Sequence, residues 1–346
     1  ALSLSAFLIL LQNPMELFQA GFLLSFGAVL GIAIFLPSLN CLHEAKNTLQ
    51  KGIYVSVSAQ ALTLPIVLYY FFQIPVYSVF INLIVIPLTS LLMLTALLAG
   101  IVGIVSLSLG VFIAGGANYI LIFYEMVCRL GSKLPGNLIT VGRPDTVIIW
   151  IYIAILSVFI ISARKYNKKR LLILIVVALA ILIIPKSKDG LTVTMLDVGQ
   201  GDAIFMETDS GTTYLVDGGS LDVNQVGRYR ITPYLLSRGT DTLDYAIVTH
   251  TDTDHVSGLM ELIEGEQIYI KNLVLPNTTA KNEIYHQLET LAKKKEIKLM
   301  YIVAGDKIID GKVQMTFLHP PAGYQPASNN DYSAVISIRY EEFDML

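Results

Sequence analysis

Four of the six residues from His250 to His255 are types that bind metal ions, in the order His250, Asp252, Asp254 and His255. The 346-residue chain has only five histidines, so two in one hexapeptide are an unusual concentration. In an extended segment the side chains at i, i+2 and i+4 point the same way, so His250, Asp252 and Asp254 are expected to converge, with His255 reaching a second position. Two imidazoles and two carboxylates can begin a two-metal site, with ions roughly 3.5–4 Å apart.

The hexapeptide follows a run typical of a buried strand, residues 244–249, and precedes a helix expected over residues 256–263. Short alternating runs after residue 190 predict strands at 191–196, 202–207, 213–216, 273–275, 298–303, 314–318 and 334–340. An amphipathic helix is expected over residues 281–295. Strands with interspersed helices indicate a layered α/β domain.

The composition separates this soluble half from an apolar one. Apolar residues make up 54% of the chain and charged residues 15%, against roughly 25% charged in a typical soluble domain. Residues 1–190 hold 12 Lys and Arg and 5 Asp and Glu, a net charge of +7, whereas residues 191–346 hold 12 and 22, a net charge of −10. Two soluble domains, a disordered chain and a disulfide-stapled scaffold are excluded; the only cysteines are Cys41 and Cys128.

The apolar half predicts a multi-pass α-helical membrane domain over residues 1–184. A spanning helix needs about 20 mostly apolar residues, and the segments that reach or approach this length are 17–37, 52–73, 78–105, 108–130 and 147–163. The shorter run 171–184 could span with its flanking basic side chains snorkelling, and residues 1–12 resemble the tail of a further helix. Residues 185–190 form the expected linker to a domain over 191–346. Both ends look cut, so we expect a fragment of a longer protein.

Charge and polar residues give further expectations for the membrane half. The segment 164–170 carries five positive charges in seven residues, and the positive-inside rule places it in the cytoplasm. Alternation then puts the loop 38–51 on the same side and everything after residue 184 on the outer face, although Arg129, Lys133 and Arg143 fall outside as well. Gln60, Asn82 and Asn118 fit either ordinary helix packing or broken helices that line a polar path.

Motifs from both halves resemble one known family. HxDxDH at 250–255, DVGQGDA at 197–203 and VDGG at 216–219 resemble the metallo-β-lactamase fold, in the variant of the ComEC-type competence proteins that carry DNA across the bacterial inner membrane. The general motif has histidine at its third position, and this chain has Asp252, as that family does. Residues 13–26, 59–65 and 82–88 are similar to segments of the family's competence domain, so the resemblance covers nearly the whole chain.

The resemblance implies a role for each candidate residue. His250 and Asp252 would bind one ion, and Asp254, the expected catalytic residue, would bind the other with His255. The supporting residues would be Asp217 beneath the metal loop and Asp197 and Asp202 at the edge of the site. Residues 329–333 are similar to the family's Asn-rich segment. His319 is left unassigned, and His286 and His43 are expected to be uninvolved.

The fold implied is an incomplete αββα metallo-β-lactamase-like domain. Its bridging aspartate and a further histidine are expected after residue 346, so the metal site would be half built here and catalysis by the fragment is doubtful. The cofactors would be two divalent ions, manganese or zinc, and the carboxylate at position 252 favours manganese. Cysteine is absent from residues 191–346, which excludes thiolate ligands.

Three functions remain open. The first is an inner-membrane channel for single-stranded DNA with an outer metal-dependent nuclease domain that degrades the other strand. The second is a DNA transporter whose metallo-domain binds or gates without hydrolysis, and the third is a membrane-anchored hydrolase of a non-nucleic substrate. The expected partners are DNA bound without regard to sequence, the lipid bilayer and other competence-machinery proteins. The charge of −10 opposes DNA binding, and the evident basic cluster is 293–295 with Lys298.

Overall fold

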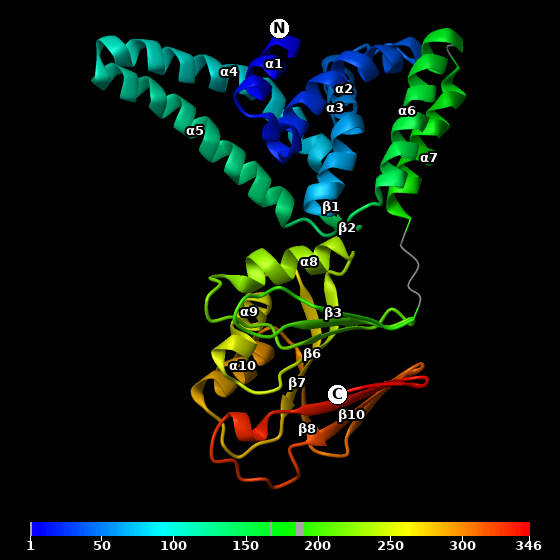
Figure 1. The fold of residues 1–346 in the computed structure, drawn as a ribbon. Helices are drawn as coiled ribbons and strands as arrows, with labels where there is room; N and C mark the ends of the chain where they lie inside the picture. The colour runs from blue at the N-terminus through cyan, green and yellow to red at the C-terminus, as the bar shows by residue number, and fades with distance from the viewer. Residues whose placement is uncertain (1, 167, 185–189) are drawn as a thin grey trace. The chain divides into compact units, whose positions relative to one another are not determined.

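The computed structural model describes residues 2–166, 168–184 and 190–346. Residue 1, Asn167 in the basic segment and residues 185–189, which are most of the predicted linker, lie outside the described residues. Contacts between residues divide the chain into two units, 1–184 and 185–346, and each is described by itself (Figure 1).

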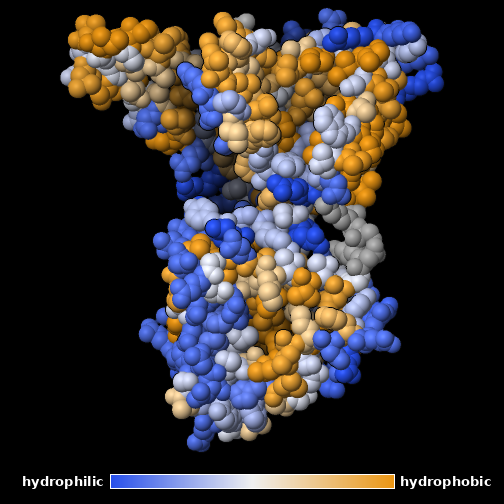
Figure 2. Space-filling model, viewed as in Figure 1, coloured by the Kyte–Doolittle hydropathy of each residue, from blue (hydrophilic) through white to orange (hydrophobic). Residues whose placement is uncertain are grey.

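Five helices of the first unit are long and apolar enough to cross a membrane: α2 (Ala20–Leu42), α3 (Thr48–Phe71), α4 (Ser78–Val105), α5 (Leu107–Ser132) and α6 (Thr146–Tyr166). They confirm the five predicted spans. The shorter helices α1 (Leu2–Gln12) and α7 (Leu172–Ile183) fall on the other two apolar segments, and the 3₁₀ turns η1 (Pro14–Phe18) and η2 (Lys169–Leu171) follow α1 and precede α7. Hydrophobic side chains cover most of the visible surface of this unit (Figure 2), as lipid contact requires.

Polar side chains inside the membrane unit join helices to one another. Gln60 Nε2 donates to Ser78 Oγ at 2.7 Å, and Asn82 Nδ2 donates to Ser56 Oγ at 3.0 Å, so both bonds connect α3 with α4. The prolines inside α3 and α4 do not interrupt either helix. These contacts favour the helix-packing interpretation of Gln60 and Asn82.

The connections between helices lie at two opposite ends of the membrane unit. Strand β1 (Gln73–Pro75), between α3 and α4, pairs antiparallel with β2 (Leu138–Thr140), between α5 and α6. At the opposite ends of the helices, Arg164 on α6 donates to Ile34 O at 2.9 Å and to Ser38 Oγ at 3.2 Å, both on α2. The sequence did not predict the β1–β2 pair, because each strand has only three residues.

Two sheets form the second unit (Figure 1). The larger has the order β3 (Thr192–Met195), β4 (Ile204–Glu207), β5 (Thr213–Val216), β6 (Thr242–Ile247), β7 (Tyr269–Pro276) and β8 (Lys298–Ile302). Its first three strands are antiparallel and β5 to β8 are parallel. The smaller sheet is antiparallel, in the order β12 (Phe343–Met345), β11 (Val335–Tyr340), β10 (Val313–His319) and β9 (Lys307–Asp310).

The two sheets pack face to face around a core that includes Met206, Ile247 and Val274 from one sheet and Met315 and Phe317 from the other. Helices α8 (Thr232–Ser237), α9 (Thr253–Glu264) and α10 (Glu283–Lys294) connect successive parallel strands. This arrangement confirms the expected layered α/β domain. Within the described ranges no helix covers the outer face of the smaller sheet, where Ile309 is 70% exposed, so three of the four expected layers are present.

Most predicted elements of the second unit lie within a few residues of their expected positions. The strand expected at 244–249 is β6, two residues earlier, and the helix expected at 256–263 begins at Thr253. The sequence missed β9, β12, the π-helical turn η3 (Gly227–Ile231) with α8, and the 3₁₀ turn η4 (Asn330–Tyr332).

Candidate metal centre

The candidate ligands lie on the connection from β6 to α9, at the carboxyl end of the parallel strands, where open α/β sheets bind ligands. The backbone is extended at Asp252, but α9 begins at Thr253 and has Asp254 in its first turn. The expected convergence of three side chains along one extended segment is therefore wrong at Asp254. That carboxylate faces His255 instead.

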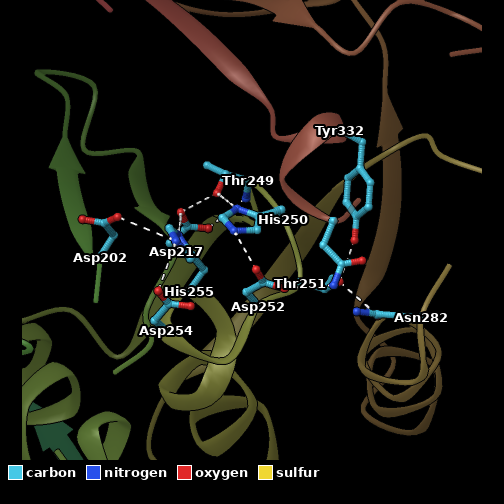
Figure 3. Close-up of polar contacts among 11 residues, drawn as sticks. Asp202, Asp217, Thr249, His250, Thr251, Asp252, Asp254, His255, Asn282 and Tyr332 are labelled. Atoms are coloured by element: carbon cyan, nitrogen blue, oxygen red, sulfur yellow. Dashed lines mark hydrogen bonds and ion pairs between the residues drawn. The ribbon is translucent and has the colours of Figure 1, made fainter. Parts of the chain in front are cut away.

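Two imidazoles and two carboxylates of this segment, together with the carboxylate of Asp202 from the connection between β3 and β4, lie close to one another (Figure 3). His250 Nε2 lies 3.6 Å from Asp252 Oδ2. His255 Nε2 lies 3.8 Å from Asp254 Oδ2 and 3.8 Å from Asp202 Oδ2, and the two histidine rings are 4.0 Å apart between centroids. The structure thus pairs His250 with Asp252 and His255 with Asp254, and it adds Asp202 to the second pair.

Asp217 orients the second histidine from beneath the loop. It follows β5 directly, in the left-handed region at φ 56°, which aspartate adopts more readily than most residues. Its buried carboxylate accepts hydrogen bonds from Thr249 N (2.8 Å), Thr249 Oγ1 (2.7 Å) and His255 Nδ1 (2.9 Å). Because a carboxylate only accepts, Nδ1 of His255 carries a proton in this bond, and Nε2 is the ring nitrogen that faces Asp202 and Asp254.

Two glycines let three segments meet under the first turn of α9. A Cβ on Gly219 would lie 2.4–2.5 Å from backbone atoms of Thr253, Asp254 and His255, and one on Gly201 would lie 2.6 Å from Asp254 O. The segments are also hydrogen bonded, since the amide of Asp202 donates to Asp254 O at 3.1 Å. The glycines of the DVGQGDA and VDGG motifs therefore have a steric role: they leave room for the backbone that carries the candidate ligands.

The local charges affect the two histidines in opposite ways. Burial lowers the pKa of His250, and the adjacent His255 lowers it further. The imidazole of His250 is therefore neutral at pH 7, which is the form that binds metal ions. Burial acts on His255 in the same direction, but the hydrogen bond and charge of Asp217, with the charges of Asp254 and Asp202, raise its pKa above the usual value. The surroundings of His255 therefore favour positive charge, which a bound cation also supplies.

Imidazole nitrogens and carboxylate oxygens are donors that bind divalent ions. Each neighbouring His–Asp pair here is spaced like two ligands of one ion. Bonds of about 2.0–2.2 Å place neighbouring ligands of a tetrahedral ion roughly 3.4 Å apart, close to the 3.6 Å and 3.8 Å observed here. In the part of the chain that the structure describes, no group of three or more His, Cys, Asp or Glu side chains could hold an ion. Residues 250–255 thus supply pairs of ligands rather than a closed set.

The remaining candidate residues have other contacts. Asp197 is 84% exposed and pairs with Arg230 at 3.4 Å. His319 Nδ1 contacts Ser333 O at 3.0 Å. His286 is exposed beside Glu289 and His43 contacts the Tyr54 hydroxyl, so the contacts of these two are structural ones.

Sequence reasoning missed the partners that hold the loop from outside. Asn329 Nδ2 donates to Asp252 Oδ1 at 2.9 Å. The buried hydroxyl of Thr251 contacts Tyr332 Oη at 2.7 Å and Asn282 Oδ1 at 3.0 Å. The Asn-rich segment stands out in the sequence only by its family resemblance, and no local pattern links Asn329 to Asp252, 77 positions earlier.

Comparisons with known proteins match both halves of the chain. The Competence protein family matches residues 1–166, and the metallo-beta-lactamase superfamily matches residues 196–305. ComE operon protein 3 of Bacillus subtilis (strain 168) is 26% identical over 360 residues, covering 97% of this chain and 45% of that protein. The chain thus spans about half the length of the curated relative that it matches.

Solved structures similar to the chain include the metallo-beta-lactamase fold protein YhfI from Bacillus subtilis, at 17% identity and a TM-score of 0.32, covering 45% of this chain and 61% of that one. Zn(2+)-bound PqqB from Methylobacterium extorquens has 16% identity and a TM-score of 0.27, covering 42% and 51%.

The family matches lie in the order that the sequence motifs predicted, a competence domain followed by a metallo-β-lactamase domain. The similarity to ComE operon protein 3 runs through both domains. The chain is therefore similar to the ComEC-type competence proteins in both its domains.

Proposed function

We propose that this chain is part of a competence protein that takes up DNA, and that its second unit is a metal-dependent nuclease that cleaves the strand not transported. The observation that carries the proposal is the joining, in one chain, of spanning helices matched to competence proteins and a loop whose imidazoles pair with carboxylates. His250 and Asp252 would hold one divalent ion, and Asp254 and His255 the other.

Divalent ions at this loop would polarise the scissile phosphate and lower the pKa of an attacking water towards about 7. The chain's own residues prepare the site. Asp217 keeps a proton on Nδ1 of His255, so that Nε2 is the ring nitrogen left to bind an ion. Asp254 directs a carboxylate oxygen toward the same point and, in the proposed reaction, orients the water by accepting its hydrogen bond.

The paired spacing supports a site that is completed by other ligands. The family resemblance places a bridging aspartate and a further histidine after residue 346, and we propose that these close the two sets in the whole protein. Manganese and zinc are the expected ions, because nitrogen and oxygen donors suit both.

The charge distribution supports a bacterial inner-membrane location with the second unit outside. The ends of α2 and α6 lie together, and the basic residues 164, 165 and 168–170, together with Lys46 and Lys51, are at this side. The positive-inside rule places these charges in the cytoplasm. The end with the β1–β2 pair and the end of α7 would then face outward.

The negative charge of the second unit favours a second candidate function, because it opposes binding of DNA for cleavage. This candidate is a transporter whose metallo-domain binds or gates without cutting. Residues 191–346 have a net charge of −10, which repels phosphates. In the basic cluster at 293–295, Lys295 Nζ donates to Glu264 O and Gly265 O, at 3.0 Å and 3.3 Å, and so caps α9. The DNA would then be held chiefly through the metal ions.

Cleavage and uptake by the Asp254→Ala variant distinguish these functions. In the whole protein, we expect Asp254→Ala to lower manganese-dependent cleavage of DNA at least about 100-fold, because one ion loses a ligand and the water loses its hydrogen-bond acceptor. The matched control is Asp209→Ala, an exposed aspartate away from the loop, which should cleave normally. Cleavage that survives Asp254→Ala contradicts the nuclease assignment, and DNA uptake without any cleavage by the unaltered protein supports gating.

A further inference from the structure

Asp252 occupies a position at which aspartate usually caps a helix. It is the N-cap residue of α9, with extended backbone angles (φ −79°, ψ 152°). An N-cap aspartate normally accepts a hydrogen bond from an amide in the first turn, which stabilises the helix. Here the side chain makes no capping hydrogen bond, so both oxygens of its carboxylate are available to other partners.

The two oxygens of that carboxylate have different neighbours. Asn329 Nδ2 donates to Oδ1 at 2.9 Å, whereas Oδ2 lies 3.6 Å from His250 Nε2 (Figure 3 shows the His250–Asp252 pair). Oδ1 of Asp252 is therefore hydrogen bonded to the Asn329 amide, and Oδ2 faces the imidazole of His250.

The segment that carries Asn329 is itself fixed to the metal loop. The amide of Ala334 donates to Thr249 O at 2.8 Å, and Tyr332 Oη contacts Thr251 Oγ1 at 2.7 Å in the buried interior. Tyr332 is fully buried. These contacts lie on both sides of His250, so the position of the Asn329 amide relative to Asp252 is set by the fold.

We infer that Asn329 is a positioning residue of the metal centre: it holds Oδ1 of Asp252 so that Oδ2 alone faces the ion shared with His250. The inference rests on the proposed metal centre and adds to it a residue outside the loop. Hydrogen bonds from outer partners fix the orientation of metal ligands, and their loss typically weakens metal affinity about 10–100-fold. Asn329 would thereby leave one oxygen of Asp252 to bind the ion.

The test uses the whole protein in detergent, which would include the proposed ligands after residue 346, with cobalt(II) as the probe. Binding is followed by equilibrium dialysis and by the visible absorption of the bound cobalt, and the unfolding midpoint of the metal-free protein is measured in parallel. Asn329→Ala should bind cobalt about 10–100-fold more weakly than the unaltered protein, and its absorption per bound ion should change because Oδ1 becomes free to coordinate. The matched control, Asn330→Ala, changes the exposed neighbouring asparagine and should bind normally.

The possible results decide between the positioning role of Asn329 and the proposed metal centre as follows. Equal cobalt affinity and spectrum for Asn329→Ala and the unaltered protein would overturn the positioning role and leave the metal centre in place. An affinity loss matched by a lower midpoint of the metal-free Asn329→Ala protein would make the role of Asn329 structural, which also overturns the inference. No cobalt bound by the unaltered protein at millimolar concentrations would overturn both.

Discussion

Replacing Asp217 with alanine is expected to destabilise the unit of residues 190–346 by about 3–5 kcal/mol and to abolish metal binding. The carboxylate receives three hydrogen bonds, two from Thr249 and one from His255, and it is 3% exposed. Alanine would leave these buried donors without an acceptor. It would also occupy the left-handed backbone conformation of this position, which adds about 1 kcal/mol.

Hydrogen exchange of the β5 and β6 amides measures the first effect, and equilibrium dialysis with manganese measures the second. Asp209→Ala serves as the control, because an exposed aspartate should change stability by no more than about 0.5 kcal/mol. A loss below about 1 kcal/mol in Asp217→Ala would mean that water replaces the carboxylate, and it would contradict the role assigned to Asp217.

Gly219→Ala is expected to be the second severe change, at about 3 kcal/mol. The added Cβ would lie 2.4 Å from the carbonyl carbon of Asp254 and 2.5 Å from both His255 N and Thr253 O. All three are backbone atoms, so the first turn of α9 must move, and the carboxylate of Asp254 and the imidazole of His255 move with it. Metal affinity should therefore fall together with stability.

The adjacent glycine provides a matched control for the Gly219 variant. A Cβ on Gly218 would meet Ile231 Cδ1 at 3.1 Å, the end of a flexible side chain. Gly218→Ala should therefore cost about 1 kcal/mol or less and leave metal affinity close to normal. Equal losses in the two variants, measured by denaturant unfolding of the chain, would show that close backbone approach at Gly219 is not what the site requires.

Elements with a strong local pattern were predictable from the sequence. The spanning helices follow from apolar runs of about 20 residues, and β5 and β6 from short apolar segments bounded by polar ones. Elements that depend on tertiary contacts were missed. Three-residue strands such as β1 and β12 exist only because a partner strand pairs with them, and the turn η3 has no periodic pattern of its own.

The site was predictable in composition and less so in geometry. The crowding of imidazole and carboxylate at 250–255 is visible in the sequence. The beginning of α9 at Thr253 separates Asp254 from the extended part of the loop, and local spacing gave no indication of it. The bond from Asn329 to Asp252 joins segments far apart in the chain, and only the fold brings them together.

Equilibrium dialysis of the whole protein, which would include the proposed ligands after residue 346, against manganese and zinc tests the proposed metal centre most directly. The unaltered protein and Asp209→Ala should bind either ion equally well, and the double variant His250→Ala/His255→Ala should bind at least about 100-fold more weakly, because each ion loses its imidazole ligand. Metal binding that is equal in the unaltered protein and the double variant, or absent from both, would contradict the assignment of these residues as ligands.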